Sequence, residues 1–168
     1  QGGPLSVVLS NVYLDKLDKE LEQRGLRFTR YADDTMVFTK SEMAANRVMK
    51  SITDWIERKL FLKVNATKTK VVRPTRSKYL GFTFLNHGGE WKVKPTTEKK
   101  KKLKQKLSEY LKRNKAIARP LAVTIKRVNE IVRGWINYFR IGMMKTFMQE
   151  FGAWLRHKIR VIVIKQWK

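Results

Sequence analysis

Two adjacent carboxylates, Asp33 and Asp34, are the residues of this sequence best suited to chemistry. They interrupt the segment 28–38, which alternates apolar and polar residues before the pair and continues with β-branched and aromatic residues after it. This pattern predicts a β-hairpin with the acids at its tip, because Asp tolerates turns while the flanks favour strands. Neighbouring carboxylates suit Mg²⁺, and two such ions can stabilise the attacking and leaving oxygens of phosphoryl transfer. The alternative is an ordinary turn in which Asp-Asp has no chemical role.

The elements around this hairpin predict an α+β fold. Apolar residues recur at three- and four-residue spacing from Leu5 to about Arg24, which predicts an amphipathic helix closed by Gly25. Ser41 is a suitable N-cap for a second helix, and short strands are expected at 60–64, 70–73, 79–84 and 91–94. Because this order contains no repeated βαβ unit, we expect an antiparallel sheet with helices on one face.

From Pro95 onward the pattern predicts a bundle of three helices. Thr97 is a suitable N-cap for the first, Pro120 begins the second, which Gly134 would interrupt, and the third starts near Lys145. Four aromatic residues of the later helices could stack on bases, but their helical spacing beside aliphatic residues favours the core: Trp135, Tyr138, Phe139 and Trp154.

Charge is unevenly distributed along the chain. The 168 residues carry a net charge of +24. Residues 1–60 contain ten Lys and Arg against nine Asp and Glu, whereas residues 61–168 contain 28 against five. A field of this kind attracts a polyanion and makes its binding strongly salt-dependent. The basic residues that we expect to contact the phosphates of a nucleic acid lie on the predicted helices: Lys99, Lys100, Lys102, Lys106, Arg113, Arg133, Arg140, Lys145, Arg156, Lys158 and Arg160.

Other features exclude several classes of protein. The chain has no cysteine, which excludes a disulfide scaffold and a thiolate zinc site, and no apolar run is long enough to span a membrane. His87 and His157 have no acid or thiolate at ligand spacing, so we assign them no metal. Since no Met precedes Gln1, we expect an excised piece of a longer protein.

Five segments together resemble the group II intron-encoded reverse transcriptase/maturase family. Four of them stand in the order and spacing of consecutive reverse-transcriptase motifs, and the fifth is similar to the maturase-specific thumb segment, also called domain X. They are residues 1–6 (QGGPLS), 30–34 (RYADD), 62–69 (LKVNATKT), 79–84 (YLGFTF) and 131–140 (IVRGWINYFR).

The resemblance implies a role for each motif. Asp33 and Asp34 match the paired acids that bind catalytic Mg²⁺ in the palm, with Mn²⁺ as an alternative ion. Lys68 matches a lysine thought to assist the leaving pyrophosphate, although a solvated turn lysine is nearly as good an explanation. The remaining matches are the loop near the incoming nucleotide and template, Gln1, Gly2 and Gly3, and the primer-supporting hairpin, Tyr79, Leu80 and Gly81. The chain departs from the family at Val7-Val8, where Pro-Leu is usual.

A further departure concerns the third metal-binding carboxylate of the family, which lies upstream of the Gln1 loop. Two carboxylates are too few to fix two ions and a triphosphate, so we expect these residues alone not to polymerise. The resemblance therefore implies residues 1–94 as the C-terminal part of a palm and 95–168 as a helical thumb.

The expected parent function is RNA-directed DNA synthesis. Its partners would be template or intron RNA, an RNA/DNA primer duplex, deoxynucleoside triphosphates and the missing N-terminal fingers and palm segment, with no membrane involved. We expect a bacterial cytoplasmic protein associated with the nucleoid or a ribonucleoprotein, with an organelle as the alternative. A non-catalytic RNA-binding splicing cofactor, in which the palm is only a scaffold, remains the alternative function. A basic ribosomal-type assembly protein would not require the Tyr31–Asp34 motif.

Overall fold

A computed structural model describes residues 3–167, and the chain divides into two compact units, residues 1–73 and 74–168. The sequence placed the change from palm to thumb at residues 94 and 95. The compact units divide earlier, so that the second hairpin belongs to the same unit as the C-terminal helices.

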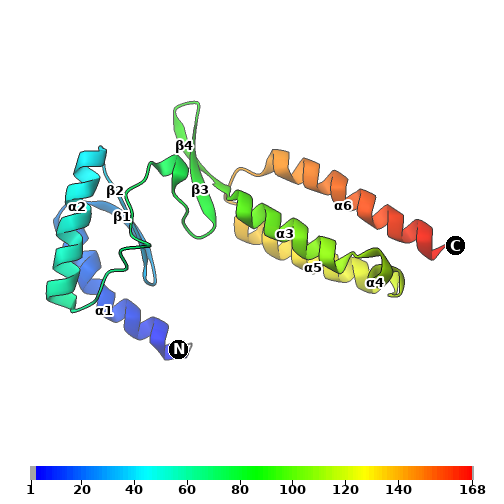
Figure 1. Cartoon of the computed structure of the whole chain (residues 1–168), viewed down its shortest axis with the longest axis horizontal. Helices are drawn as coiled ribbons and strands as arrows, with labels where there is room; N and C mark the ends of the chain where they lie inside the picture. The colour runs from blue at the N-terminus through cyan, green and yellow to red at the C-terminus, as the bar shows by residue number, and fades with distance from the viewer. Residues whose placement is uncertain (1–2, 168) are drawn as a thin grey trace. The chain divides into compact units, whose positions relative to one another are not determined.

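The first unit begins with helix α1, Pro4–Gln23 (Figure 1). Arg24 caps it, and Gly25 follows in the left-handed conformation at a φ of 64°, which confirms the predicted helix end. Only the C-terminal half of the apolar stripe is packed, through Leu17 and Leu21, which are almost fully buried. The apolar residues of the N-terminal half are exposed: Leu5, Val7, Val8, Leu9 and Val12.

An antiparallel hairpin, β1 (Arg27–Tyr31) and β2 (Asp34–Phe38), follows α1. Helix α2, Glu42–Trp55, begins at Ser41, whose Oγ accepts a hydrogen bond from the Ala44 N–H at 3.2 Å. A single π-helical turn, η1, Ile56–Leu60, extends α2 and buries Leu60 against α1. The predicted hairpin and the predicted Ser41 N-cap of the second helix are therefore confirmed.

The strands predicted at 60–64 and 70–73 do not form among the described residues. Leu60 ends the η1 turn, and Phe61 adopts a left-handed conformation with a φ of 54°. Burial of Leu60 at the end of a helix and the lack of a pairing strand explain why a strand-like sequence remains irregular here. Asn65 then closes a turn by accepting hydrogen bonds from the N–H groups of Thr67 and Lys68, both at 3.1 Å.

The second unit begins with a short 3₁₀ turn, η2, Pro74–Arg76, and a second antiparallel hairpin, β3 (Phe82–His87) and β4 (Glu90–Pro95). The strand predicted from residue 79 starts only at Phe82, because Tyr79 and Phe82 bridge across a tight turn at Leu80-Gly81. The hairpin joins the helices through a hydrogen bond from the Met143 N–H to the Val93 carbonyl at 2.8 Å. This contact explains why the compact units divide before the hairpin.

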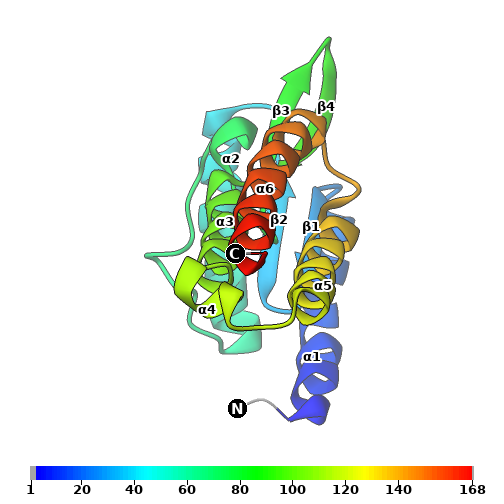
Figure 2. The same ribbon diagram turned by 90° about the vertical axis from the view of Figure 1, so that its right-hand side faces the viewer.

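Four helices complete the second unit: α3 (Thr97–Tyr110), α4 (Arg113–Ile117), α5 (Leu121–Phe139) and α6 (Lys145–Gln166). Thr96, not Thr97, caps α3, and α5 is continuous through Gly134. The short α4 was not predicted. Helices α3 and α5 lie side by side, and α6 covers the seam between them (Figures 1 and 2).

Their shared core combines buried residues from all four helices: Leu103, Leu107, Leu111, Ala116, Val128, Phe151 and Ile162. The fold is α+β, with two separate two-stranded hairpins where the sequence predicted one antiparallel sheet. Among the described residues, no helix has both the length and the apolar character needed to cross a bilayer.

Candidate functional site

The β1–β2 hairpin fixes where the two acids lie. Its register pairs Tyr31 with Asp34, so that Ala32 and Asp33 form a two-residue turn and Asp34 is the first residue of β2. Both acids are exposed. The structure therefore places both carboxylates at the hairpin tip, as the sequence predicted.

Strand alternation sets the direction of Asp34. Phe28 and its partner Val37 pack on the cluster of Leu17, Leu21 and Leu60, which defines the buried face of the hairpin. Asp34 is three positions from Val37, so it lies on the opposite face from this cluster. Asp34 thus points away from the core and is exposed.

Arg30 connects the turn to α1. Its guanidinium donates two hydrogen bonds to the carboxylate of Asp18, from Nε at 2.7 Å and from NH2 at 2.5 Å. Its NH1 donates to the Asn11 Oδ1 at 2.9 Å and to the Ala32 carbonyl at 3.0 Å. A guanidinium fork bound to both oxygens of a carboxylate is a strong and directional contact. The turn that carries Asp33 is therefore attached to the helix beneath it.

The donor set suits a hard divalent cation in part. Asp33 and Asp34 supply neighbouring carboxylate oxygens on a short stiff hairpin, which are the ligands that Mg²⁺ prefers. Within the described residues, no group of three or more His, Cys, Asp or Glu side chains could hold a metal. The two carboxylates alone therefore supply only part of the ligand set that a divalent cation needs.

Gly3 and Lys68, from two of the other predicted motifs, are exposed in the first unit. Gln1 and Gly2 lie outside the described residues, and Gly3 is the exposed N-cap of α1. Lys68 is exposed in the turn closed by Asn65. The geometry of the turn suits both of the explanations that the sequence left open for this lysine.

The predicted primer-supporting residues pack against the end of α5. The Leu80 carbonyl accepts a hydrogen bond from the Tyr138 hydroxyl at 2.9 Å, and the Gly81 carbonyl accepts one from the Thr96 N–H at 2.9 Å. Gly81 has a φ of 84°, a conformation in which a side chain is strained. The turn of residues 79–82 therefore belongs to the body of the second unit.

The lysines of α3 divide into two groups. Lys100 and Lys104 lie over the rings of Phe147 and Trp154, at 5.2 and 5.3 Å from the ring centroids. Burial, followed by the neighbouring Lys94, lowers the pKa of Lys100. The other basic residues predicted to contact RNA are exposed: Lys99, Lys102, Lys106, Arg113, Arg133, Arg140, Lys145, Arg156, Lys158 and Arg160.

The aromatic residues of the bundle mostly contribute to its core. Phe139 is buried, and Trp135 and Trp154 pack against the core cluster, as the sequence predicted. Tyr138 is the exception, since its side chain is 54% exposed and stacks on Phe82.

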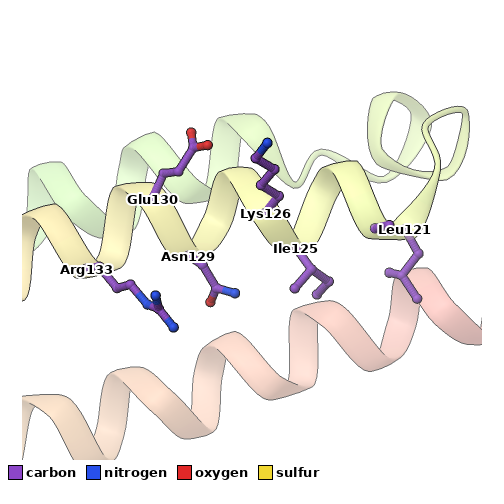
Figure 3. Close-up of a pocket in the computed structure, with 7 residues that line it drawn as sticks. Leu121, Ile125, Lys126, Asn129, Glu130 and Arg133 are labelled. Atoms are coloured by element: carbon purple, nitrogen blue, oxygen red, sulfur yellow. The ribbon is translucent and has the colours of Figure 1, made fainter.

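A groove runs along α5 in the second unit and has a volume of about 710 Å³. Arg133, Asn129, Ile125 and Leu121 project from α5 toward α6 (Figure 3). Arg133 thus places a guanidinium at the edge of an otherwise largely apolar groove. A second hollow, of about 480 Å³, lies in the first unit. Most of the residues that line it are basic, namely Arg24, Arg47, Lys50, Arg58 and Lys59, and the others are Ser51, Asp54 and Trp55. The sequence did not indicate this hollow, because its residues are spread over α1, α2 and η1.

Comparison with protein families agrees with this arrangement. The family "Reverse transcriptase (RNA-dependent DNA polymerase)" matches residues 1–84, which is half of the chain, and "Group II intron, maturase-specific domain" matches residues 100–168. The chain belongs to the group II intron reverse transcriptase/maturase family. The match to the reverse transcriptase family includes both carboxylates of the hairpin, and the maturase-specific match begins within α3. No curated protein matches the chain.

This reverse transcriptase/maturase segment contains one contact network that sequence reasoning did not assign. Asn11 and Asp18 are seven residues apart, which places them on one face of α1, and both accept hydrogen bonds from Arg30. The sequence did contain a hint of this network. Two polar residues, Asn11 and Asp18, stand seven positions apart on the predicted helix, and the strand that follows contains Arg30.

Proposed function

We propose that this chain supplies the paired metal-binding carboxylates and the thumb of an RNA-directed DNA polymerase, with residues 1–94 as the C-terminal part of its palm and 95–168 as the thumb. The observation that carries the proposal is the hairpin tip, where Asp33 and Asp34 are adjacent and exposed and where Asp34 lies on the face opposite the core. Membership of the reverse transcriptase family gives this geometry its chemical interpretation.

The two acids would act as ligands, each holding its oxygen atoms in a fixed direction. Bound Mg²⁺ would supply Lewis-acid stabilisation of the charge that develops when a primer 3′-hydroxyl attacks the α-phosphate of a deoxynucleoside triphosphate. In the proposal, Lys68 places a positive charge near the departing pyrophosphate. The Gly3 region approaches the incoming nucleotide and template, and the Leu80–Gly81 turn contacts the primer end.

The helices of the second unit would hold RNA. Among the described residues, acids are rare on these helices, whereas exposed Lys and Arg recur on α3, α5 and α6. Like charges spaced along a helix repel one another, and contact with a phosphate backbone relieves that repulsion. The maturase-specific match over residues 100–168 supports intron RNA as one such ligand.

A splicing cofactor without polymerase activity is the second candidate, and the dominance of positive charge in the second unit favours it. The two candidates differ in whether the carboxylates matter. In the full-length protein that carries this sequence, Asp33→Asn and Asp34→Asn should abolish primer extension on an RNA template while leaving intron RNA affinity unchanged. Asp54→Asn, an exposed acid on α2, is the matched control.

Full primer extension by both Asn variants would refute the role of Asp33 and Asp34 as catalytic metal ligands. A full-length protein that supports splicing but extends no primer on an RNA template would establish the cofactor function instead.

A further inference from the structure

The hairpin turn that carries the two acids has an unfavourable backbone conformation. Ala32 has a φ of 54°, which places it in the left-handed region. A residue with a Cβ is strained in this conformation, so neighbouring contacts must hold it in place. Glycine would avoid the strain, but the chain has Ala at this position.

Arg30 supplies the contact that reaches this residue. Its NH1 donates a hydrogen bond to the Ala32 carbonyl at 3.0 Å, and the peptide unit that includes this carbonyl leads directly into Asp33. The carbonyl direction and the Asp33 backbone are therefore fixed together.

The guanidinium is itself immobilised by α1. Asp18 binds it through both carboxylate oxygens at 2.7 and 2.5 Å, and Asn11 accepts from NH1 at 2.9 Å. The Arg30 side chain is only 11% exposed and that of Asp18 25%, so solvent screens this contact less than a surface ion pair. Leu17, the neighbour of Asp18, is buried in the core of the unit. Short, directional hydrogen bonds thus connect the packed helix α1, through Arg30, to the turn at Ala32.

We propose that Arg30 is a positioning residue for metal binding, through which Asp18 and Asn11 fix the Ala32 peptide and thereby the directions of Asp33 and Asp34. The inference rests on the proposed function, since positioning matters only if the two acids hold the ions. Lysine cannot replace arginine in this role, because one ammonium group cannot bind both carboxylate oxygens and also reach the asparagine and the carbonyl in a planar fork.

The competing explanation is that the pair only adds stability. The same helix offers a matched comparison, because Arg24 binds Glu20 through Nε at 2.7 Å and NH2 at 2.6 Å at the end of α1 remote from the turn. Arg24→Lys should change stability alone. Arg30→Lys should change the turn as well.

The first experiment measures the turn without any metal. In the 168-residue chain, NMR of the Ala32 amide gives the three-bond H–N–C–H coupling that reports φ, together with the ¹³C shifts of both Asp carboxyls. We expect Arg30→Lys and Asp18→Asn to shift all three signals and Arg24→Lys to leave them unchanged. An Ala32 coupling that is unchanged in a folded Arg30→Lys chain would overturn the proposal. Asn11→Ala, which removes a single acceptor, provides a milder variant if Arg30→Lys does not fold.

The second experiment uses primer extension by the full-length protein, well below its melting temperature. For Arg30→Lys we expect kcat to fall at least roughly tenfold and the Mg²⁺ concentration for half-maximal rate to rise several-fold, with the KM for primer–template unchanged. Equal Mg²⁺ dependence of Arg30→Lys and Arg24→Lys would overturn the positioning role. Activity retained by Asp33→Asn and Asp34→Asn would instead refute the proposed function, while the NMR result on the turn would stand.

Discussion

The Tyr138 hydroxyl donates a hydrogen bond to the Leu80 carbonyl at 2.9 Å, which ties the end of α5 to the turn before β3. Phe82 reinforces this contact by packing against Tyr138 and Phe139, with ring centroids 5.9 and 4.9 Å apart. The residues proposed to support the primer and the maturase-specific segment of α5 are therefore parts of one packed body. A change in either is expected to affect the other.

Gly81 should be intolerant of a side chain for this reason. In Gly81→Ala, the new Cβ would meet Lys99 Cε at 2.9 Å and Phe139 Cζ at 3.4 Å while the backbone keeps a φ of 84°. We expect Gly81→Ala to lower the free energy of unfolding by about 1–2 kcal/mol, mostly from the left-handed backbone, because the Lys99 side chain can move. Urea unfolding of the 168-residue chain, followed by circular dichroism, measures the change.

Gly134→Ala is the control for Gly81→Ala, and we expect it to change stability in the opposite direction. Gly134 lies within α5, and a Cβ there meets nothing within 4 Å. We expect a gain of about 0.5–1 kcal/mol, because alanine is the better helix former. Destabilisation by Gly134→Ala would contradict the continuous helix α5.

The core of the second unit depends on α3. Leu107 is fully buried in the cluster shared by the four helices. Leu107→Ala should reduce the free energy of unfolding by about 2–5 kcal/mol, because it removes apolar contacts and leaves a cavity. Thermal unfolding measures this loss. Leu5→Ala, at a side chain that is 67% exposed on α1, should stay within about 0.5 kcal/mol of the parent.

RNA binding should depend on the exposed lysines of α3. Replacing Lys99, Lys102 and Lys106 by Gln should weaken RNA binding and flatten its salt dependence, by about 0.7–0.9 in the logarithmic slope for each phosphate that the variant no longer neutralises. Fluorescence anisotropy at several salt concentrations gives the slope. The control replaces three exposed lysines of the first unit by Gln: Lys16, Lys50 and Lys63. A control slope that falls as much as that of the α3 variant would show that only net charge matters.

The 168-residue chain by itself should not carry out template-dependent DNA synthesis. Among its described residues, no three His, Cys, Asp or Glu side chains lie together so that they could hold a metal ion. Two carboxylates are too few to fix two ions with a triphosphate. A primer-extension assay with Mg²⁺ and with Mn²⁺ tests this expectation directly. Any RNA-templated extension product from the isolated chain would contradict it.

The sequence by itself determined the local features of this reverse transcriptase/maturase segment. The turn preference of Asp33 and Asp34, the apolar spacing of α1 and α2 and the Ser41 cap depend on neighbouring residues, so they could be predicted. The motifs also led to the family, because their order along the chain is a property of sequence alone.

The tertiary structure decided which of these local preferences were realised and what surrounds the candidate site. Of the strand-like residues 60–64, Leu60 ends a helical turn because it is buried against α1, and the rest are irregular. Lys100 and Lys104 lie over aromatic rings of α6, a contact between residues more than forty positions apart in sequence. The bonds from Arg30 to Asn11 and Asp18 likewise require α1 and β1 to be packed together. Such contacts form only where segments that are distant in sequence pack together, and local sequence patterns do not determine that packing.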